Sequence, residues 1–252
     1  MTGLDRLQES LRREMARDCE HVALPGFDAY VDHLRTPRYY SCAIPRADAG
    51  AGHLPALRAA FAERDRNARA EFFPALNPEL EAVLLADGWT VSERMPVMTC
   101  TPDALVAPTP VGGLRIEQVD GQSPEDLVLG FLRAQRVAFR DDTPITDEEV
   151  VRWRGRGGWH VAGLIDGTMT GTALCAAAPD GITEVGGVAT PPEFRRRGIA
   201  AAVTHAAVAA AFADGVELAW LTAAADDSRR IYERTGFEDV GVLLSYDAPS
   251  GI

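Results

Sequence analysis

The sequence predicts an α/β (α+β) fold, with a mixed central sheet flanked by helices and a smaller α/β half before it. Three observations support this class. Strand and helix patterns alternate through residues 114–246, and both hairpins and helical crossovers join the strands. Residues 101–113 carry three prolines and two glycines between two patterned segments, as a linker does. We therefore expect an N-terminal domain over residues 1–108 and a second domain over residues 109–252.

The second half contains the more regular patterns. Its expected elements are a strand at 114–119, a helix at 124–139, strands at 159–165, 168–178 and 182–190, a helix from 199 to about 213, a strand at 216–223, a helix at 226–235 and a strand at 238–246. Asp166-Gly167 marks a hairpin turn, and Asp214-Gly215 ends the alanine-rich helix. Gly186-Gly187 falls inside a strand, which indicates a bulge or the close approach of a ligand.

The N-terminal half is less regular. We expect strands at 38–44, 70–73 and 90–99, and helices at 54–63 and 78–87. Residues 80–100 repeat the plan of residues 229–247, which is a helix, a Gly-aromatic pair and a long strand. This echo favours a degenerate duplicate of the second half, although two ordinary helix-turn-strand units would produce the same pattern.

Composition excludes several classes of protein. The hydrophobic share of 46% and charged share of 25% are typical of globular proteins, and no apolar run approaches the roughly 20 residues of a membrane span. No secretory signal pattern opens the sequence, so we expect a cytoplasmic protein that does not bind membranes. The net charge is −12, and all 25 basic residues are arginine, which argues against nucleic acid as a partner.

Cysteine usage predicts neither a metal site nor a disulfide framework. The four cysteines lie far apart in sequence, and we interpret them as reduced and structural: Cys19, Cys42, Cys100 and Cys175. His160 and His205 are each isolated and are expected to be structural. We therefore predict that no metal is bound.

Residues 188–201, VATPPEFRRRGIAA, carry the most chemical information. A tight loop that opens a helix presents unpaired backbone N–H groups and the positive end of the helix dipole, which together suit a diphosphate. Gly198 lets the backbone approach an anion, and Arg195, Arg196 and Arg197 add positive charge. The alternative is a solvated charge run beside an ordinary helix start.

This segment resembles the diphosphate loop of the GNAT superfamily of N-acetyltransferases, whose pattern is Arg/Gln-x-x-Gly-x-Gly/Ala. The run from Arg195 to Ala200 fits the pattern, and Tyr232, Gly236 and Phe237 match the family's Tyr-x-x-x-Gly-Phe signature. The order of elements is also that of the family, so the resemblance covers roughly residues 112–247. The first half has no arginine-glycine loop and has Leu84 where its echo would need the tyrosine, so a duplicate would have lost cofactor binding.

The resemblance implies acetyl-CoA as cosubstrate and an amine acceptor, either a small molecule or a protein N-terminus. The strand before the loop would pair with the pantetheine arm, the loop amides would hold the diphosphate, and the short helix would add a contact. The implied cofactor-binding residues are Val188, Ala189, Thr190, Arg195, Arg196, Arg197, Gly198, Ile199, Ala200, Ala201 and Ser228. Three alternatives stay open. The protein could form a homodimer, it could use a longer acyl-CoA as donor, or it could be a regulatory protein that binds acetyl-CoA without turnover.

Two residues are expected to transfer protons. The resemblance makes Glu184 the candidate base, eleven residues before Arg195, and Tyr232 the candidate acid at the thioester sulfur. Their alternatives are a surface glutamate and a packing tyrosine. Ala225 stands where the family often has asparagine. Residues 152–158 are interpreted as a solvated loop, with contact to a substrate carboxylate as the alternative.

Overall fold

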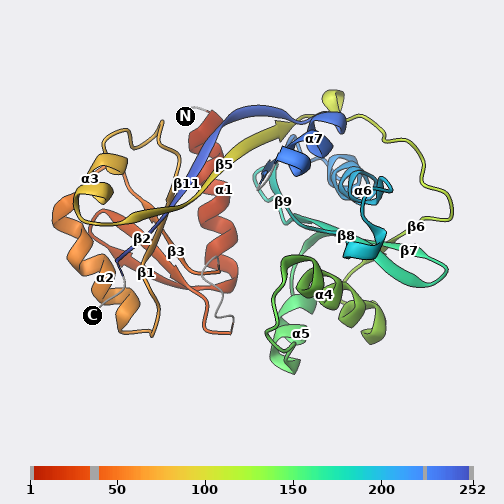
Figure 1. Cartoon of the computed structure of the whole chain (residues 1–252), viewed down its shortest axis with the longest axis horizontal. Helices are drawn as coiled ribbons and strands as arrows, with labels where there is room; N and C mark the ends of the chain where they lie inside the picture. Colours follow the sequence, from red (N-terminus) through yellow and green to blue (C-terminus); the bar gives the residue numbers. More distant parts are fainter. Residues whose placement is uncertain (1–2, 35–39, 224–225, 250–252) are drawn as a thin grey trace. The chain divides into compact units, whose positions relative to one another are not determined.

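The computed structural model describes residues 3–34, 40–223 and 226–249, and the chain forms two compact units (Figure 1). The first unit comprises residues 1–97 and 240–252, and the second comprises residues 98–239. These limits differ from the expected boundary between residues 108 and 109. The reason is that two long strands, one from each half of the sequence, divide their residues between the units.

The first unit combines a mixed sheet with helices. Its elements are α1 (Gly3–Asp18), β1 (Glu20–Leu24), β2 (Phe27–Val31), β3 (Cys42–Pro45), α2 (Leu54–Ala62), β4 (Arg69–Phe72), α3 (Leu80–Ala86), most of β5 (Thr90–Cys100) and most of β11 (Glu238–Asp247). The strand order is β1-β2-β3-β4-β11-β5. β1, β2 and β3 are successive antiparallel neighbours, and helix α2 connects the parallel strands β3 and β4.

Large apolar side chains form the core of this unit. Phe61 of α2, Leu84 of α3 and Phe72 of β4 are fully buried there, as is Tyr246 of β11. Each buried side chain of this size contributes about 1.5–3 kcal/mol. The end of β11 is therefore an integral part of the first core.

A buried arginine links β4 to β5 and β11. The Arg69 guanidinium, 2% exposed, lies 2.8 Å from Glu71 and 2.6 Å from Glu93. The Ser245 hydroxyl donates to Glu71 at 3.2 Å. Because a buried charge without partners is costly, this network ties the register of the three strands.

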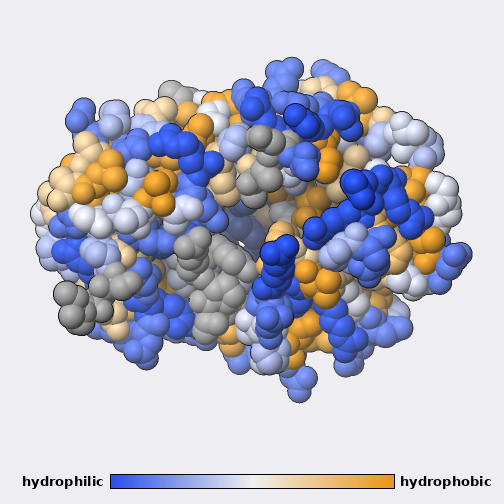
Figure 2. Space-filling view, viewed as in Figure 1, coloured by the Kyte–Doolittle hydropathy of each residue, from blue (hydrophilic) through white to orange (hydrophobic). Residues whose placement is uncertain are grey.

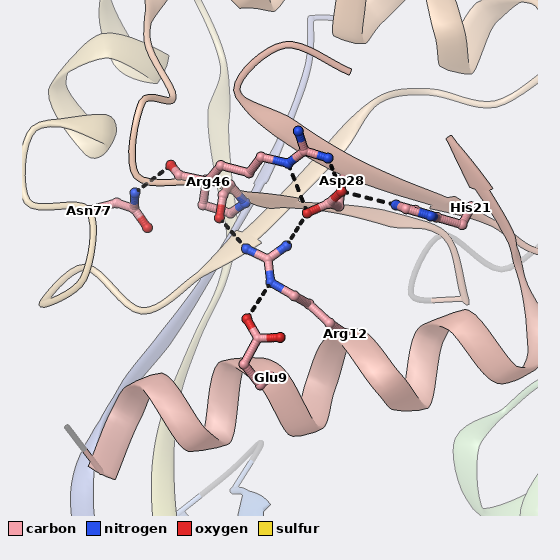
Figure 3. Close-up of polar contacts among 7 residues, drawn as sticks. Glu9, Arg12, His21, Asp28, Arg46 and Asn77 are labelled. Atoms are coloured by element: carbon pink, nitrogen blue, oxygen red, sulfur yellow. Dashed lines mark hydrogen bonds and ion pairs between the residues drawn. The ribbon is translucent and has the colours of Figure 1, made fainter. Parts of the chain in front are cut away.

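An ionic cluster around Asp28 holds α1 on the sheet of the first unit (Figure 3). The Asp28 carboxylate accepts from Arg12 of α1 at 2.5 Å, from Arg46 at 2.6 Å and from His21 at 3.0 Å. Burial alone would raise the pKa of Asp28, but the hydrogen bonds from Arg46 and His21 and the charges of both arginines lower it. Arg12 also donates to the carbonyl of Pro45, so one side chain joins the helix to two strands.

The second unit is an α/β layer structure. Its elements are the end of β5, β6 (Arg115–Val119), α4 (Glu125–Phe139), α5 (Asp147–Arg154), β7 (Gly158–Ile165), β8 (Thr168–Ala176), β9 (Ile182–Ala189), α6 (Ile199–Ala213), β10 (Leu218–Thr222), α7 (Asp226–Arg234) and the start of β11. The strand order is β5-β10-β9-β8-β7-β6, with β9 and β10 parallel and β6 to β9 antiparallel.

Helices cover both faces of this sheet. α6 and α7 lie on one face, and α4 and α5 lie on the other (Figure 1). The first face packs Val203 and Tyr232 against Val185, Met98 and other strand residues. The second packs Phe131 and Trp153 against Ala162 and Leu164 of β7. The expected fold class is confirmed, and in the second half each predicted element is found within about two residues.

Four elements were not predicted: α1, β1, β2 and α5. Residues 152–158 are only partly a loop, because α5 continues to Arg154, whose side chain donates to the carbonyls of Gly121 and Ser123 at 2.7 and 2.9 Å. Residues 101–113 lie inside the second unit, where the Val106 N–H donates to the Thr235 carbonyl at 3.1 Å. The strand expected at 38–44 begins at Cys42, and residues 35–39 lie outside the described part of the chain.

The two units share one order of elements. In each, two antiparallel strand pairs lead to a parallel crossover through a helix, then a short helix and a long strand. The long strand of each half, β5 or β11, also has residues that belong to the unit formed mainly by the other half. The echo between residues 80–100 and 229–247 corresponds to the last two elements of this order, which are the short helix and the long strand.

Among the described residues, no helix is long and apolar enough to span a membrane. Hydrophilic side chains predominate on the face shown in Figure 2, with apolar ones scattered among them.

Candidate active site

The N-terminus of α6 presents backbone N–H groups that no side chain caps. Gly198 is the N-cap residue, in a left-handed conformation with φ of 84°, and makes no side-chain cap hydrogen bond. Its carbonyl accepts from the N–H of Ala202 at 3.1 Å. The N–H groups of Ile199, Ala200 and Ala201 precede this bond and have no partner within the helix. With the helix dipole, they form a site for an anionic group.

The three arginines before Gly198 have different roles. Arg195 donates through Nε to the carbonyl of Thr190 at 3.0 Å and so closes the loop. Arg196 has a φ of 62°, unusual for a residue with a side chain, and Arg197 lies over the Phe194 ring at 5.8 Å. All three side chains belong to exposed residues. Besides its charge, Arg195 thus contributes a hydrogen bond that fixes the backbone of the loop.

Strand β9 carries the bulge expected at the glycine pair. Thr172 of β8 pairs with Ala189 and Leu174 pairs with Gly186, so Gly187 and Val188 together oppose one residue of β8. Only Gly187 of the pair has a positive φ, at 56°. Its carbonyl accepts from the Thr172 hydroxyl at 2.8 Å and from Gln135 Nε2 of α4 at 3.3 Å. Thr172 and Gln135 were not predicted as site residues, because neither belongs to a recognisable sequence pattern.

The sheet opens beside this bulge. The parallel pairing of β9 with β10 covers Ile182 to Glu184 and ends with Glu184 opposite Trp220. The remainder of β9, up to Ala189, thus has an edge without a β10 partner in the register. Just beyond it, the hydroxyl oxygen of Thr190 is buried without a hydrogen-bond partner in the described chain. An extended ligand with hydrogen-bonding groups would satisfy both features.

Glu184 and Tyr232 belong to different faces of the sheet. Val185 packs in the core with α6 and α7, so its neighbour Glu184 points to the face that carries α4 and α5. Glu184 is half-buried. Tyr232 of α7 lies in the core on the α6 face, 8% exposed, with its ring 6.1 Å from Phe237.

The Tyr232 phenol is held in its neutral form. Burial raises the pKa of Tyr232 to about 12. Within the described residues, no group hydrogen-bonds its phenol oxygen. At neutral pH the phenol therefore keeps its proton. Ser228 lies on the same helix and is half-buried, whereas Ala225 lies outside the described residues.

The other predicted cofactor residues divide into backbone and side-chain candidates. Ile199 and Ala189 are buried in the protein, at 1% and 2% exposure, so only their backbone groups can face a ligand. Val188, Ala200 and Ala201 are half-buried. The structure thus brings the strand, the loop and the helix start together in one unit.

A buried ion-pair network fixes α4 and the segment that follows it. Arg136 lies 2.6 Å from Asp141 and 2.7 Å from Glu149 of α5, and its Nε donates to the carbonyl of Thr143. The pKa of Asp141 is lowered, because hydrogen bonds from Thr143 and the charge of Arg136 outweigh the effect of burial. The network orients the helix turn that carries Gln135.

The isolated histidines and the cysteines have structural surroundings. His160 is 4% exposed, with its ring 5.0 Å from that of Trp153 and 6.1 Å from that of Phe131. His205 is half-buried, and burial lowers its pKa. All four cysteines are free, and burial raises the pKa of Cys175. Within the described ranges, no group of three His, Cys, Asp or Glu residues is arranged to hold a metal ion.

Comparisons with known proteins show similarity in sequence and in fold. The model of the acetyltransferase (GNAT) family matches residues 128–237. A GCN5-related N-acetyltransferase from Kribbella flavida is 28% identical, with a TM-score of 0.81 over 100% of this chain and 97% of that chain. One from Sphaerobacter thermophilus is 19% identical, with a TM-score of 0.66 over 90% of this chain and 78% of that chain.

A tandem GNAT protein from the clavulanic acid biosynthesis pathway is similar in fold, at 15% identity and a TM-score of 0.60 over 90% of this chain and 79% of that chain. No curated protein matches the sequence. The matched residues 128–237 include the loop at Gly198, the bulged strand and the segment from Tyr232 to Phe237. The chain is thus similar to acetyltransferases of the GNAT family over residues 128–237, which lie in its second unit.

Proposed function

We propose that the second unit transfers an acetyl group from acetyl-CoA to an amine by direct attack of the amine on the thioester. The observation that carries this proposal is the uncapped N-terminus of α6 at Gly198, next to the open edge of β9. One feature suits a diphosphate and the other suits an extended arm. When bound, acetyl-CoA supplies an acetyl group activated as a thioester.

The loop would hold the diphosphate mainly through its backbone. The N–H groups from Arg196 to Ala201 and the dipole of α6 offer donors and positive potential. Gly198 is exposed and has no Cβ to obstruct the anion. Arg196 and Arg197 add charge in a chain whose net charge is −12.

The edge of β9 would hold the arm. Backbone groups of Val188 and Ala189 lie along the strand where no β10 partner pairs, and the buried Thr190 hydroxyl gains a partner when a polar ligand is present. Burial of an unpaired hydroxyl costs about 1–3 kcal/mol, so a polar ligand group that reaches the Thr190 hydroxyl would be favoured.

Glu184 and Tyr232 would divide the proton transfers between the two faces. A protonated amine of pKa near 10 must lose a proton before attack, and Glu184 on the α4 face is the base of the proposal. Tyr232, neutral and buried on the α6 face, would donate a proton to the departing sulfur. The acceptor is an amine of a small molecule or of a protein N-terminus, and the negative net charge favours a cationic acceptor.

We also propose that the first unit is a duplicate that no longer binds the cofactor. Its shared order of elements supports duplication. The helix equivalent to α6 is α2, whose N-cap is His53 with an ordinary negative φ of −94°. The unit therefore lacks the left-handed glycine and the arginines that open α6.

Calorimetric titration with acetyl-CoA tests the proposed site. Gly198→Glu should abolish binding through bulk and charge, whereas Gly215→Glu at the other end of α6 should leave it intact. Gly215 is a matched control, because its φ of 93° imposes the same strain and its Cβ would have open space around it. Loss of binding in Gly198→Glu alone supports the site, and absence of binding in the unmodified protein refutes the proposal.

Turnover with amine acceptors then separates an enzyme from a binding protein. Acetyl-CoA binding without release of free thiol, over a broad set of amines, would favour a regulatory protein. Donors of increasing acyl length would show whether acetyl is the preferred group.

A further inference from the structure

The bulge in β9 is held by side chains rather than by a neighbouring strand. The carbonyl of Gly187 accepts from the Thr172 hydroxyl and from Gln135 Nε2. Thr172 is fully buried on β8, and Gln135 is half-buried on α4. Two elements that both precede β9 in the chain, α4 and β8, thus meet at one backbone oxygen.

This carbonyl needs external partners. A bulge leaves its extra residue out of the sheet ladder, and a buried carbonyl without a donor costs about 1–3 kcal/mol. Gly186 and Gly187 also offer no side chains to resist a change of register. A shift by one residue would turn Val188 and Ala189 to the opposite faces of the sheet.

The space around Gly187 is shaped for Gln135. A Cβ built on Gly187 would lie 2.2 Å from Gln135 Nε2, so the amide occupies the position that a side chain would need. The Arg136 network, described above, holds the same turn of α4 in place. The donor, the glycine and the supporting ion pairs therefore form one arrangement.

We propose that Gln135 and Thr172 are positioning residues for the cosubstrate. By fixing the Gly187 carbonyl, they set the direction of the backbone from Val188 to Thr190, the edge that would receive the pantetheine arm. This inference rests on the proposed function. It assigns the two residues to the arm and not to the diphosphate, which would be held at the start of α6.

The test compares two ligands on each variant by calorimetry. One ligand is acetyl-CoA, and the other is adenosine 3′-phosphate 5′-diphosphate, which has the diphosphate but no arm. The variants are Gln135→Met and Thr172→Val, which remove one donor each, and Thr172→Ser, which retains the hydroxyl. Thr170→Val is the matched control, because Thr170 is also fully buried on β8 and donates to a strand carbonyl, that of Gly163, at 3.0 Å.

Gln135→Met and Thr172→Val should each weaken acetyl-CoA binding about 5- to 10-fold, the effect of losing one hydrogen bond, and change the affinity for the arm-less nucleotide less than about two-fold. Thr172→Ser and Thr170→Val should keep the wild-type ratio of the two affinities. A purely structural role would lower both affinities together or neither, and either result overturns the inference. If the unmodified protein binds neither ligand, the proposed function fails and this inference fails with it.

Gln135→Met keeps the test decisive if Thr172→Val does not fold. The substituted side chain is half-buried on a helix, where methionine is well tolerated. An unchanged ratio of affinities in a folded Gln135→Met protein would by itself overturn the role of Gln135.

Discussion

Tyr232→Phe is the substitution that most directly tests the proposed chemistry. The change removes one oxygen and retains the ring that packs 6.1 Å from Phe237. Because no described residue hydrogen-bonds the phenol, its loss should alter the free energy of unfolding by less than about 0.5 kcal/mol. Loss of a proton donor should lower kcat by about ten-fold or more, which corresponds to about 1.4 kcal/mol in the activation barrier.

Tyr246→Phe provides the reverse case. Tyr246 is 1% exposed in the first unit, and its hydroxyl donates to Glu81 at 2.8 Å. Burial and the Glu81 carboxylate raise the pKa of Tyr246 to about 12, the same value as for Tyr232. Loss of this hydroxyl should lower the free energy of unfolding by about 1 kcal/mol, a figure already reduced because Glu81 is one-third exposed. This change corresponds to about 2–4 °C in Tm. It should leave kcat unchanged.

The assay combines thermal unfolding with steady-state release of thiol at saturating acetyl-CoA. The expected result is a crossed pattern, in which one substitution lowers kcat and the other lowers Tm. Full activity in Tyr232→Phe, at unchanged stability, would refute its role as the acid. A large loss of Tm in that variant would show that its hydroxyl is structural.

Two further outcomes follow from the charged groups. Glu184→Gln should lower kcat about ten-fold or more while the Kd of acetyl-CoA changes little, and an unchanged kcat would exclude Glu184 as the base. Arg12, Arg46 and His21 lower the pKa of Asp28 in the folded state. The ionised Asp28 should therefore stabilise the fold fully above its unfolded pKa of about 3.9. This stabilisation should be lost as the pH falls through the lower pKa of the folded state. Asp28→Asn should therefore flatten the acid limb of a stability-against-pH curve, and an unaltered limb would contradict this assignment.

Local patterns predicted much of the second unit. The loop at Gly198, the helix start and the strand irregularity each depend on residues near one another in sequence. The glycine pair indicated the bulge, although only Gly187 adopts the left-handed conformation. The Tyr232 segment was found for the same reason, since its helix, glycine and aromatic residue are contiguous.

Other features depend on partners that local patterns do not encode. Thr172 and Gln135 converge on Gly187 from residues 15 and 52 positions away. α1 carries its apolar residues on a narrow stripe, with Leu7 and Leu11 buried, and its attachment relies on the distant Asp28. The predicted domain boundary followed the proline-rich segment, whereas the units are defined by strand partners chosen across the whole sheet.

The division of β5 and β11 also has a consequence for the order of synthesis. The second unit is one continuous stretch, residues 98–239, so all of its residues exist once that stretch has been made. The core of the first unit includes Leu244, Tyr246 and Ala248, which the ribosome adds more than 140 positions after β5 begins. The first unit therefore begins to be synthesised before the second but is completed after it. Until β11 has been synthesised, the edge of β4 that pairs with β11 has no partner strand.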